Sequence, residues 1–133
     1  MSMHLADVAA WLQAEFPAVP VQINRLQDAP DEVICINVQG GPQILEGAFE
    51  ESYVIVRVRG VRNDGSHPTS DADAEALSLA VHAFISAEQG SMELGTTYVM
   101  SIFPSSGPPS YSGQDVDLRP LYQGSYQFKV ATI

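Results

Sequence analysis

The sequence has little positive charge, a single cysteine and no long uninterrupted hydrophobic run. Six Lys and Arg stand against 16 Asp and Glu, which gives a formal net charge of −10. A surface of that sign repels phosphate, so specific binding to DNA or RNA is not expected. Cys35 lies in an apolar run, which predicts a buried thiol in a reducing compartment. The first twenty residues lack a basic segment followed by an apolar stretch, so neither a signal peptide nor a membrane span is expected.

Patterns typical of catalysis or metal binding are also missing. The three histidines share no metal-ligand spacing, and none stands beside a cysteine or carboxylate in a known arrangement. No serine lies between two glycines as a nucleophile elbow requires, and no glycine pattern opens a helix to hold phosphate. We therefore predict no enzymatic activity and no cofactor; a catalytic triad would require the fold to gather a His and an acid from distant positions.

The length and composition predict one folded domain, residues 1–133. A chain of 133 residues is close to the commonest domain size, and 45% hydrophobic residues against 17% charged residues support a packed core. Apolar residues recur at helical spacing over residues 3–15, where Pro17 ends the pattern. A second helix is expected over 71–89, with Ser70 and Asp73 as a capping box and Gly90 as the stop.

Five strands are expected, at 21–26, 33–38, 53–59, 97–103 and 122–130. The segment 28–31 is expected to be a turn between the first two strands, 40–51 a long excursion, and 104–120 a loop too long for a hairpin turn. Helices and strands do not alternate regularly. The sequence thus predicts an α+β fold, a mostly antiparallel sheet with two helices packed on one face.

Tyr53, Arg57 and Arg59 share one face of the expected 53–59 strand, with Arg62 just beyond it. One interpretation is intramolecular pairing with carboxylates, which contributes little to stability. The other is a strip in a subunit interface, where Arg and Tyr are enriched. The sequence leaves both open.

The acidic residues favour structural roles. Asp71 and Asp73 open the second helix, so stabilisation of the positive end of its dipole is favoured over a cation site. Asp115 and Asp117 lie in a loop without a paired His or Glu and are expected to be solvated.

Taken in order, these segments resemble a known protein family. The pattern comprises the amphipathic first helix, the strand 53–60, an Ala-rich helix, a strand entering a Pro-rich loop, and an Asp-x-Asp-x-Arg stretch (115–119) before the aromatic strand 122–130. It resembles the tail terminator and minor capsid proteins of long-tailed phages. Tyr53, Arg57 and Arg59 match the strand signature of that family, and Arg119 matches the loop signature.

The resemblance implies a structural virion protein without enzymatic activity. Such a protein forms a hexameric ring, caps the tail tube at its finished length and joins the head connector. Its partners would be copies of itself, the tail tube protein and the head-tail connector proteins, and DNA may pass through the ring without specific binding. It would reside in the virion tail after assembly in the bacterial host cytoplasm, with no membrane contact.

A ring of this kind requires two different patches on each subunit. The Arg-bearing strand face and the acidic start of the second helix (Asp71 and Asp73) are expected to be complementary. A head completion or neck protein is an alternative of the same class. A small hydrolase or ligand-binding domain that uses 104–120 as a lid is an alternative of another class; a deep apolar pocket under that loop would favour it.

Overall fold

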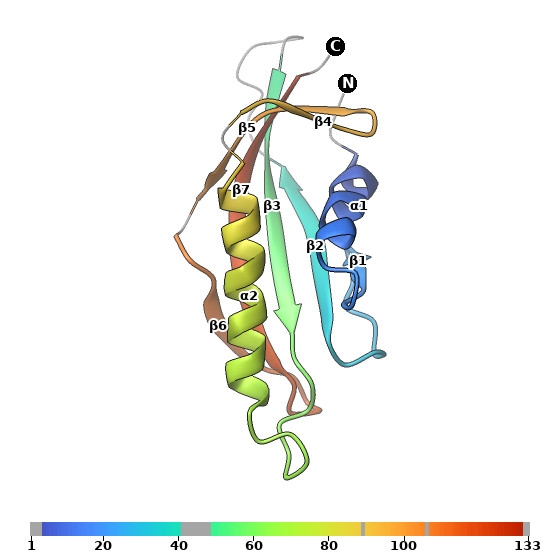
Figure 1. Ribbon diagram of the computed structural model, residues 1–133, viewed down its shortest axis with the longest axis vertical. Coiled ribbons are helices and arrows are strands. Elements are labelled where there is room, and N and C mark those ends of the chain that lie inside the picture. Colours follow the sequence, from blue (N-terminus) through green and yellow to red (C-terminus); the bar gives the residue numbers. More distant parts are fainter. Residues whose placement is uncertain (1–3, 41–48, 89, 106, 132–133) are drawn as a thin grey trace.

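The computed structural model describes residues 4–40, 49–88, 90–105 and 107–131. Within these residues the chain forms two helices and seven strands (Figure 1). In chain order they are α1 (Leu5–Glu15), β1 (Val21–Ile23), β2 (Val33–Gly40), β3 (Phe49–Arg59), α2 (Ser70–Ser86), β4 (Met92–Leu94), β5 (Thr97–Pro104), β6 (Ser110–Gln114) and β7 (Pro120–Ala131).

The strands form one sheet in the order β1-β2-β3-β7-β5-β4, with β6 also paired to β7. The long strands β3 and β7 lie at its centre and pair antiparallel from Phe49 opposite Ala131 to Arg59 opposite Leu121. Every pairing is antiparallel except that of β1 with β2. The predicted α+β fold with a mostly antiparallel sheet is therefore confirmed.

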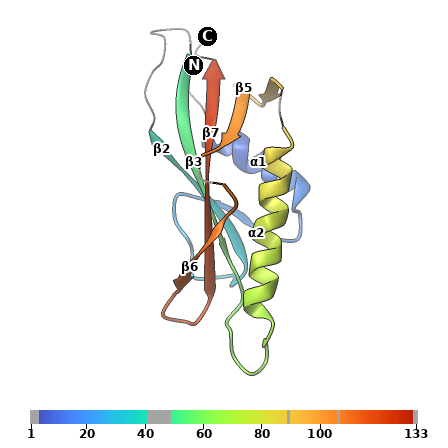
Figure 2. The same ribbon diagram turned by 90° about the vertical axis from the view of Figure 1, so that its left-hand side faces the viewer.

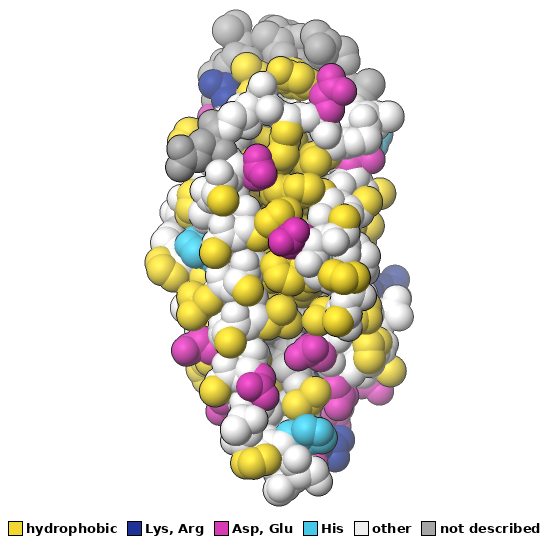
Figure 3. Space-filling model, viewed as in Figure 1, with side chains coloured by type: hydrophobic (Ala, Val, Ile, Leu, Met, Phe, Trp, Pro, Cys, Tyr) yellow, Lys and Arg dark blue, Asp and Glu magenta, His cyan; other side chains and the backbone are white. Residues whose placement is uncertain are grey.

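Both helices cover the same face of the sheet (Figure 2). α2 packs on β7, β3 and β5, while α1 packs on β1 and β2. Side chains alternate along a strand, so Val54, Val56 and Val58 of β3 point into the core beneath the helices. From the helix side, hydrophobic side chains gather between the two helices and acidic ones are spread along the molecule (Figure 3).

The first two strands differ from the expected pair. β1 is limited to three residues and runs parallel to β2, with Val21 opposite Ile34. A single turn at 28–31 cannot join parallel neighbours, so the whole segment 24–32 carries the chain back to the start of β2. Asn24 begins this return with a φ of 70°, a left-handed conformation that Asn tolerates better than most residues.

The expected loop 104–120 is also partly ordered into the sheet. Its residues 110–114 form β6, which pairs with the first half of β7, while β5 pairs with the second half. β6 and the three-residue β4 were not predicted, because such short segments carry too little alternation to stand out. The expected excursion at 40–51 falls largely on residues 41–48, which lie outside the described residues; its ends belong to β2 and β3.

The second helix begins and ends differently from the prediction. α2 spans Ser70–Ser86, shorter at its end than the expected 71–89. Ser70 does not form a capping box, because its Oγ donates a hydrogen bond to the carbonyl of Val61 at 2.8 Å. The Thr69 hydroxyl instead donates to Asp73 Oδ2 at 3.0 Å. Neither helix in the described part of the chain has the length and apolar character needed to cross a membrane.

Candidate functional site

The face of the sheet opposite the helices, here called the helix-free face, carries mostly uncharged polar side chains. Tyr53, Ile55 and Arg57 of β3 are half-buried on it. Their neighbours from β2 and β7 are amides and a hydroxyl: Asn37, Gln39, Gln123, Ser125 and Gln127. Interface cores are depleted of charge. Glu51 and Lys129 lie toward one end of this face, so it is the centre around Arg57 that has the low charge of a contact surface, in a chain of net charge −10.

Arg57 lies at the centre of this face, in a shallow hollow of about 350 Å³. The hollow, here called the Arg57 hollow, is lined by Asn24, Asn37, Gln39, Ile55, Arg57 and Gln123. One terminal nitrogen of Arg57 lies 3.3 Å from the carbonyl of Asn24 and 3.6 Å from Cys35 Sγ, and its Nε is buried without a partner among the described residues. These contacts are long, so the guanidinium is poorly satisfied within its own chain.

Arg59 belongs to the same face of β3 but is not exposed on it. Its side chain is buried beneath the returning segment 24–32, with only 2% of the residue exposed. Its nitrogens donate to three backbone carbonyls, those of Gln27, Pro30 and Asp31, at 2.6 to 2.8 Å. A neighbouring subunit cannot reach this guanidinium, which corrects the expectation that Arg59 lies in an interface strip. Arg59 instead holds the segment 24–32 against the sheet through these three hydrogen bonds.

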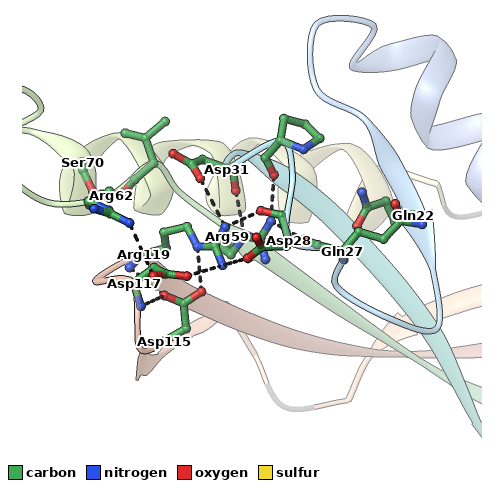
Figure 4. A network of polar contacts seen from close by, with 12 residues as sticks. Gln22, Gln27, Asp28, Asp31, Arg59, Arg62, Ser70, Asp115, Asp117 and Arg119 are labelled. Atoms are coloured by element: carbon green, nitrogen blue, oxygen red, sulfur yellow. Dashed lines mark hydrogen bonds and ion pairs between the residues drawn. The ribbon is translucent and has the colours of Figure 1, made fainter.

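Arg119 is buried beside Arg59 and completes the same network (Figure 4). Its Nε donates to Asp115 Oδ2 at 2.8 Å, and one terminal nitrogen donates to the carbonyl of Asp28 at 2.6 Å. Asp31 and Asp117 contribute further ion pairs. The expectation that Arg119 contacts another subunit is likewise corrected, because the residue is only 5% exposed and its guanidinium donates to partners within its own chain.

The network sets the ionisation of its members. Desolvation acts to raise the pKa of Asp115, but hydrogen bonds from Arg119 and from the Asp117 amide outweigh it, so this pKa lies below the ordinary value. Desolvation acts to lower the pKa of Arg119, and its carboxylate partners reverse that direction. Burial and the nearby charge of Arg119 lower the pKa of Arg59. The carboxylates thus bind Arg119 directly and favour the charged form of Arg59 through their nearby charge.

Asp115 also builds the turn between β6 and β7, residues 115–118, here called the acidic turn. Its Oδ1 accepts the amides of Asp117 and Arg119, both at 3.0 Å. The turn holds Val116 97% exposed and Leu118 45% exposed, the latter at a φ of 61°. The sequence analysis expected Asp115 and Asp117 to be solvated. That expectation was wrong, because both carboxylates contact Arg119 and Asp115 also accepts two backbone amides. The Asp-x-Asp-x-Arg spacing carried the signal, since an Asp side chain commonly bonds amides two residues ahead.

Asp71 and Asp73 are exposed in the first turn of α2, as predicted. Asp71 lies near Tyr122 at the start of β7. Burial raises the pKa of Tyr122, and the negative charges of Glu75 and Asp71 raise it further. Arg62 and Asp117 form an exposed ion pair of 3.4 Å, which ties the acidic turn to the loop before α2. The acidic start of α2 and the acidic turn therefore share one end of the molecule (Figure 1).

The histidines are separate in the fold. His82 of α2 is half-buried, and its Nδ1 lies 2.8 Å from the hydroxyl of the buried Tyr126. His67 pairs with Asp64 at the surface. Among the described residues, no group of three His, Cys, Asp or Glu side chains is placed to hold a metal ion. Burial raises the pKa of the Cys35 thiol, as expected of a structural cysteine.

Comparison with known proteins adds little to this picture. No protein-family model matches the sequence. No curated protein matches it significantly. One similar solved protein, whose name describes no activity, aligns over 97% of this chain and 96% of its own, with 19% identity and a TM-score of 0.47. A likeness of that strength carries no argument about function.

Proposed function

We propose that this chain is a structural virion protein that caps the tail tube of a long-tailed phage as a hexameric ring and joins it to the head connector. The observation that carries the proposal is the helix-free face: it is half-buried, its centre around Arg57 carries uncharged polar side chains, and the described residues leave it uncovered beyond the segment 24–32. Polar sheet faces of this composition suit contact with protein. The sequence resemblance supplies the class of assembly.

A ring requires two different surfaces on each subunit that meet head to tail. In the proposed ring, Tyr53 and Arg57 on the helix-free face form part of one surface. Asp71 and Asp73, exposed at the start of α2, belong to the other. Arg59 and Arg119 act indirectly, since they hold the segment 24–32 against the lower part of the same face.

A small hydrolase or ligand-binding domain has less support. That alternative requires the segment 104–120 to act as a lid over a deep apolar pocket. Residues 110–114 are instead hydrogen-bonded into the sheet as β6, and the apolar side chains of the described part of the segment point outward at Tyr111, Val116 and Leu118. Exposed apolar side chains at loop ends favour protein contact.

The charge of the chain suits a ring through which DNA passes. With 16 acids against six basic residues, and with Arg59 and Arg119 buried, phosphate finds few accessible cations. We propose that DNA crosses the lumen without specific binding. A fluorescence anisotropy titration with duplex DNA at physiological salt tests this, and saturable binding would count against it.

Electron microscopy of co-assembled particles tests the proposal. Purified chain is mixed with tail tubes from a long-tailed phage that lack their terminator, and in parallel with portal complexes. Rings at one end of the tubes are the expected result. Rings bound only to portal complexes would instead support the alternative, a head completion or neck protein. Binding to neither would contradict both.

A further inference from the structure

Two features of the chain leave groups exposed or unsatisfied that its own fold does not use. The first is the Arg57 hollow, in which a guanidinium makes only long contacts and pairs with no carboxylate of the described residues. Arg62 and Arg119, by contrast, lie in ion pairs. Arg57 thus retains donors that the subunit leaves unused, on a surface lined by further amide groups.

The second feature is the acidic turn. Two backbone amides and the guanidinium of Arg119 bind both oxygens of Asp115. The result of this buried scaffold is a fixed turn that holds Val116 97% exposed and keeps Leu118 in the left-handed region. Conformational strain and a wholly exposed apolar side chain both disfavour the isolated subunit, and such features concentrate at binding sites.

We propose that the acidic turn of one subunit docks into the Arg57 hollow of a second copy of the chain. This inference rests on the proposed ring and names the contact that closes it. Val116 packs against Ile55, and a carboxylate beside it binds the free nitrogens of Arg57. The surrounding amides of Asn37 and Gln123 provide hydrogen bonds for the backbone of the turn.

Charge complementarity identifies a second copy as the occupant. Asp28, which contacts Arg119 beside the turn, and Asp117 within the turn have side chains 92% and 40% exposed, so their carboxylates are accessible to a neighbour. The cationic hollow attracts acidic surfaces and repels basic ones. With 16 acids against six basic residues, a second copy of this chain supplies such an acidic surface.

The position of the two surfaces determines the kind of assembly. The hollow lies on the helix-free face, and the acidic turn lies at the end of the molecule where β6 meets β7 (Figure 2). Different patches that meet in this way form a heterologous contact, which closes into a ring or continues as a filament. An isologous dimer would require each patch to meet its own copy.

Two variants, each damaging one side of the contact, test this inference. Arg57→Glu removes the cation from the hollow, and Val116→Asp adds charge to the turn at a position that makes no core contact. Sedimentation velocity across a concentration series should show that each weakens self-association by about tenfold or more. Arg57→Gln is the milder second variant if Arg57→Glu fails to fold. The matched controls are Arg25→Gln, an exposed arginine outside the hollow, and Leu79→Asp, a 43% exposed leucine on α2.

Mixing the two variants gives the sharper result. Arg57→Glu chains keep an intact turn, and Val116→Asp chains keep an intact hollow, so an equimolar mixture should form 1:1 dimers and nothing larger. Wild-type oligomers that tolerate both variants, or a mixture without dimers, would overturn this contact while leaving the proposed ring standing. Wild-type chain that stays monomeric up to millimolar concentration, and is also absent from tail tubes, would overturn both.

Discussion

Nε of Arg119 lies 2.8 Å from Oδ2 of Asp115, four residues earlier in the chain, and this pair joins the β6–β7 turn to the segment 24–32. Through Arg119 the turn also contacts Asp28 and Asp31, which lie 91 and 88 residues away in sequence. One buried guanidinium thus fixes two surface segments whose own side chains are largely exposed.

Replacing Arg119 by Leu should destabilise the fold strongly. The substitution leaves the Asp28 carbonyl and the Asp115 carboxylate without their buried donor, a loss expected to cost about 3 kcal/mol in the free energy of unfolding. Urea denaturation followed by circular dichroism measures it. The control is Arg62→Gln, which removes an exposed ion pair and should change stability by less than about 0.5 kcal/mol. Equal effects of the two variants would contradict the role of Arg119.

Asp115 should make stability dependent on pH in the acid range. Its folded-state pKa lies below 3.8, so the contribution is fully present above that value and is lost as pH falls through the folded pKa. Thermal melts of wild-type chain should therefore show a decline below about pH 4. Asp115→Asn should be less stable at neutral pH and show a smaller decline. An unchanged slope in the variant would show that other carboxylates cause it.

Tyr126 should remain protonated in the folded protein at high pH. Burial raises its pKa to about 12, whereas the ordinary value is 10.0. Because the folded pKa is raised, the contribution to stability is complete below pH 10 and is lost as pH rises through the folded value. Tyr126→Phe should reduce this alkaline loss and cost about 1 kcal/mol near neutral pH through the lost bond to His82. Ultraviolet titration of phenolate in both proteins checks the assignment.

Gly60 should not tolerate a larger residue. An added Cβ would lie 2.9 Å from the Cβ of Ala74 and 3.0 Å from Pro120, so α2 and β7 would have to shift. We expect Gly60→Ala to destabilise the chain by about 1 to 3 kcal/mol. Gly65→Ala is the control, because its Cβ would meet nothing within 4 Å. A neutral Gly60→Ala variant would contradict the packing of α2 against the end of β3.

The sequence predicted the parts of the fold that depend on local pattern. Alternation along β3 correctly placed Val54, Val56 and Val58 on the core face, and helical spacing located both helices. Alternation also placed Arg57 and Arg59 on one face, but it could not show that a returning segment buries Arg59 and leaves Arg57 half-exposed. Coverage of that kind depends on contacts between residues about thirty positions apart.

The candidate site was predictable only in part for the same reason. Tyr53, Arg57, Asp71 and Asp73 are accessible where the sequence placed them. Val116 gave no signal, because an apolar residue in a loop is as readily buried as exposed. Val116 is exposed because the hydrogen bonds of Asp115 fix the turn. The Asp-x-Asp-x-Arg spacing indicates such bonds but not the direction in which Val116 points.

The most direct test of the account is the mass of the wild-type chain in solution, measured by light scattering across a concentration series, with electron microscopy of the largest species. We expect a shift toward a closed six-fold ring, which Arg57→Glu abolishes and Arg25→Gln preserves. A monomer at every concentration that also fails to assemble on tail tubes would contradict it.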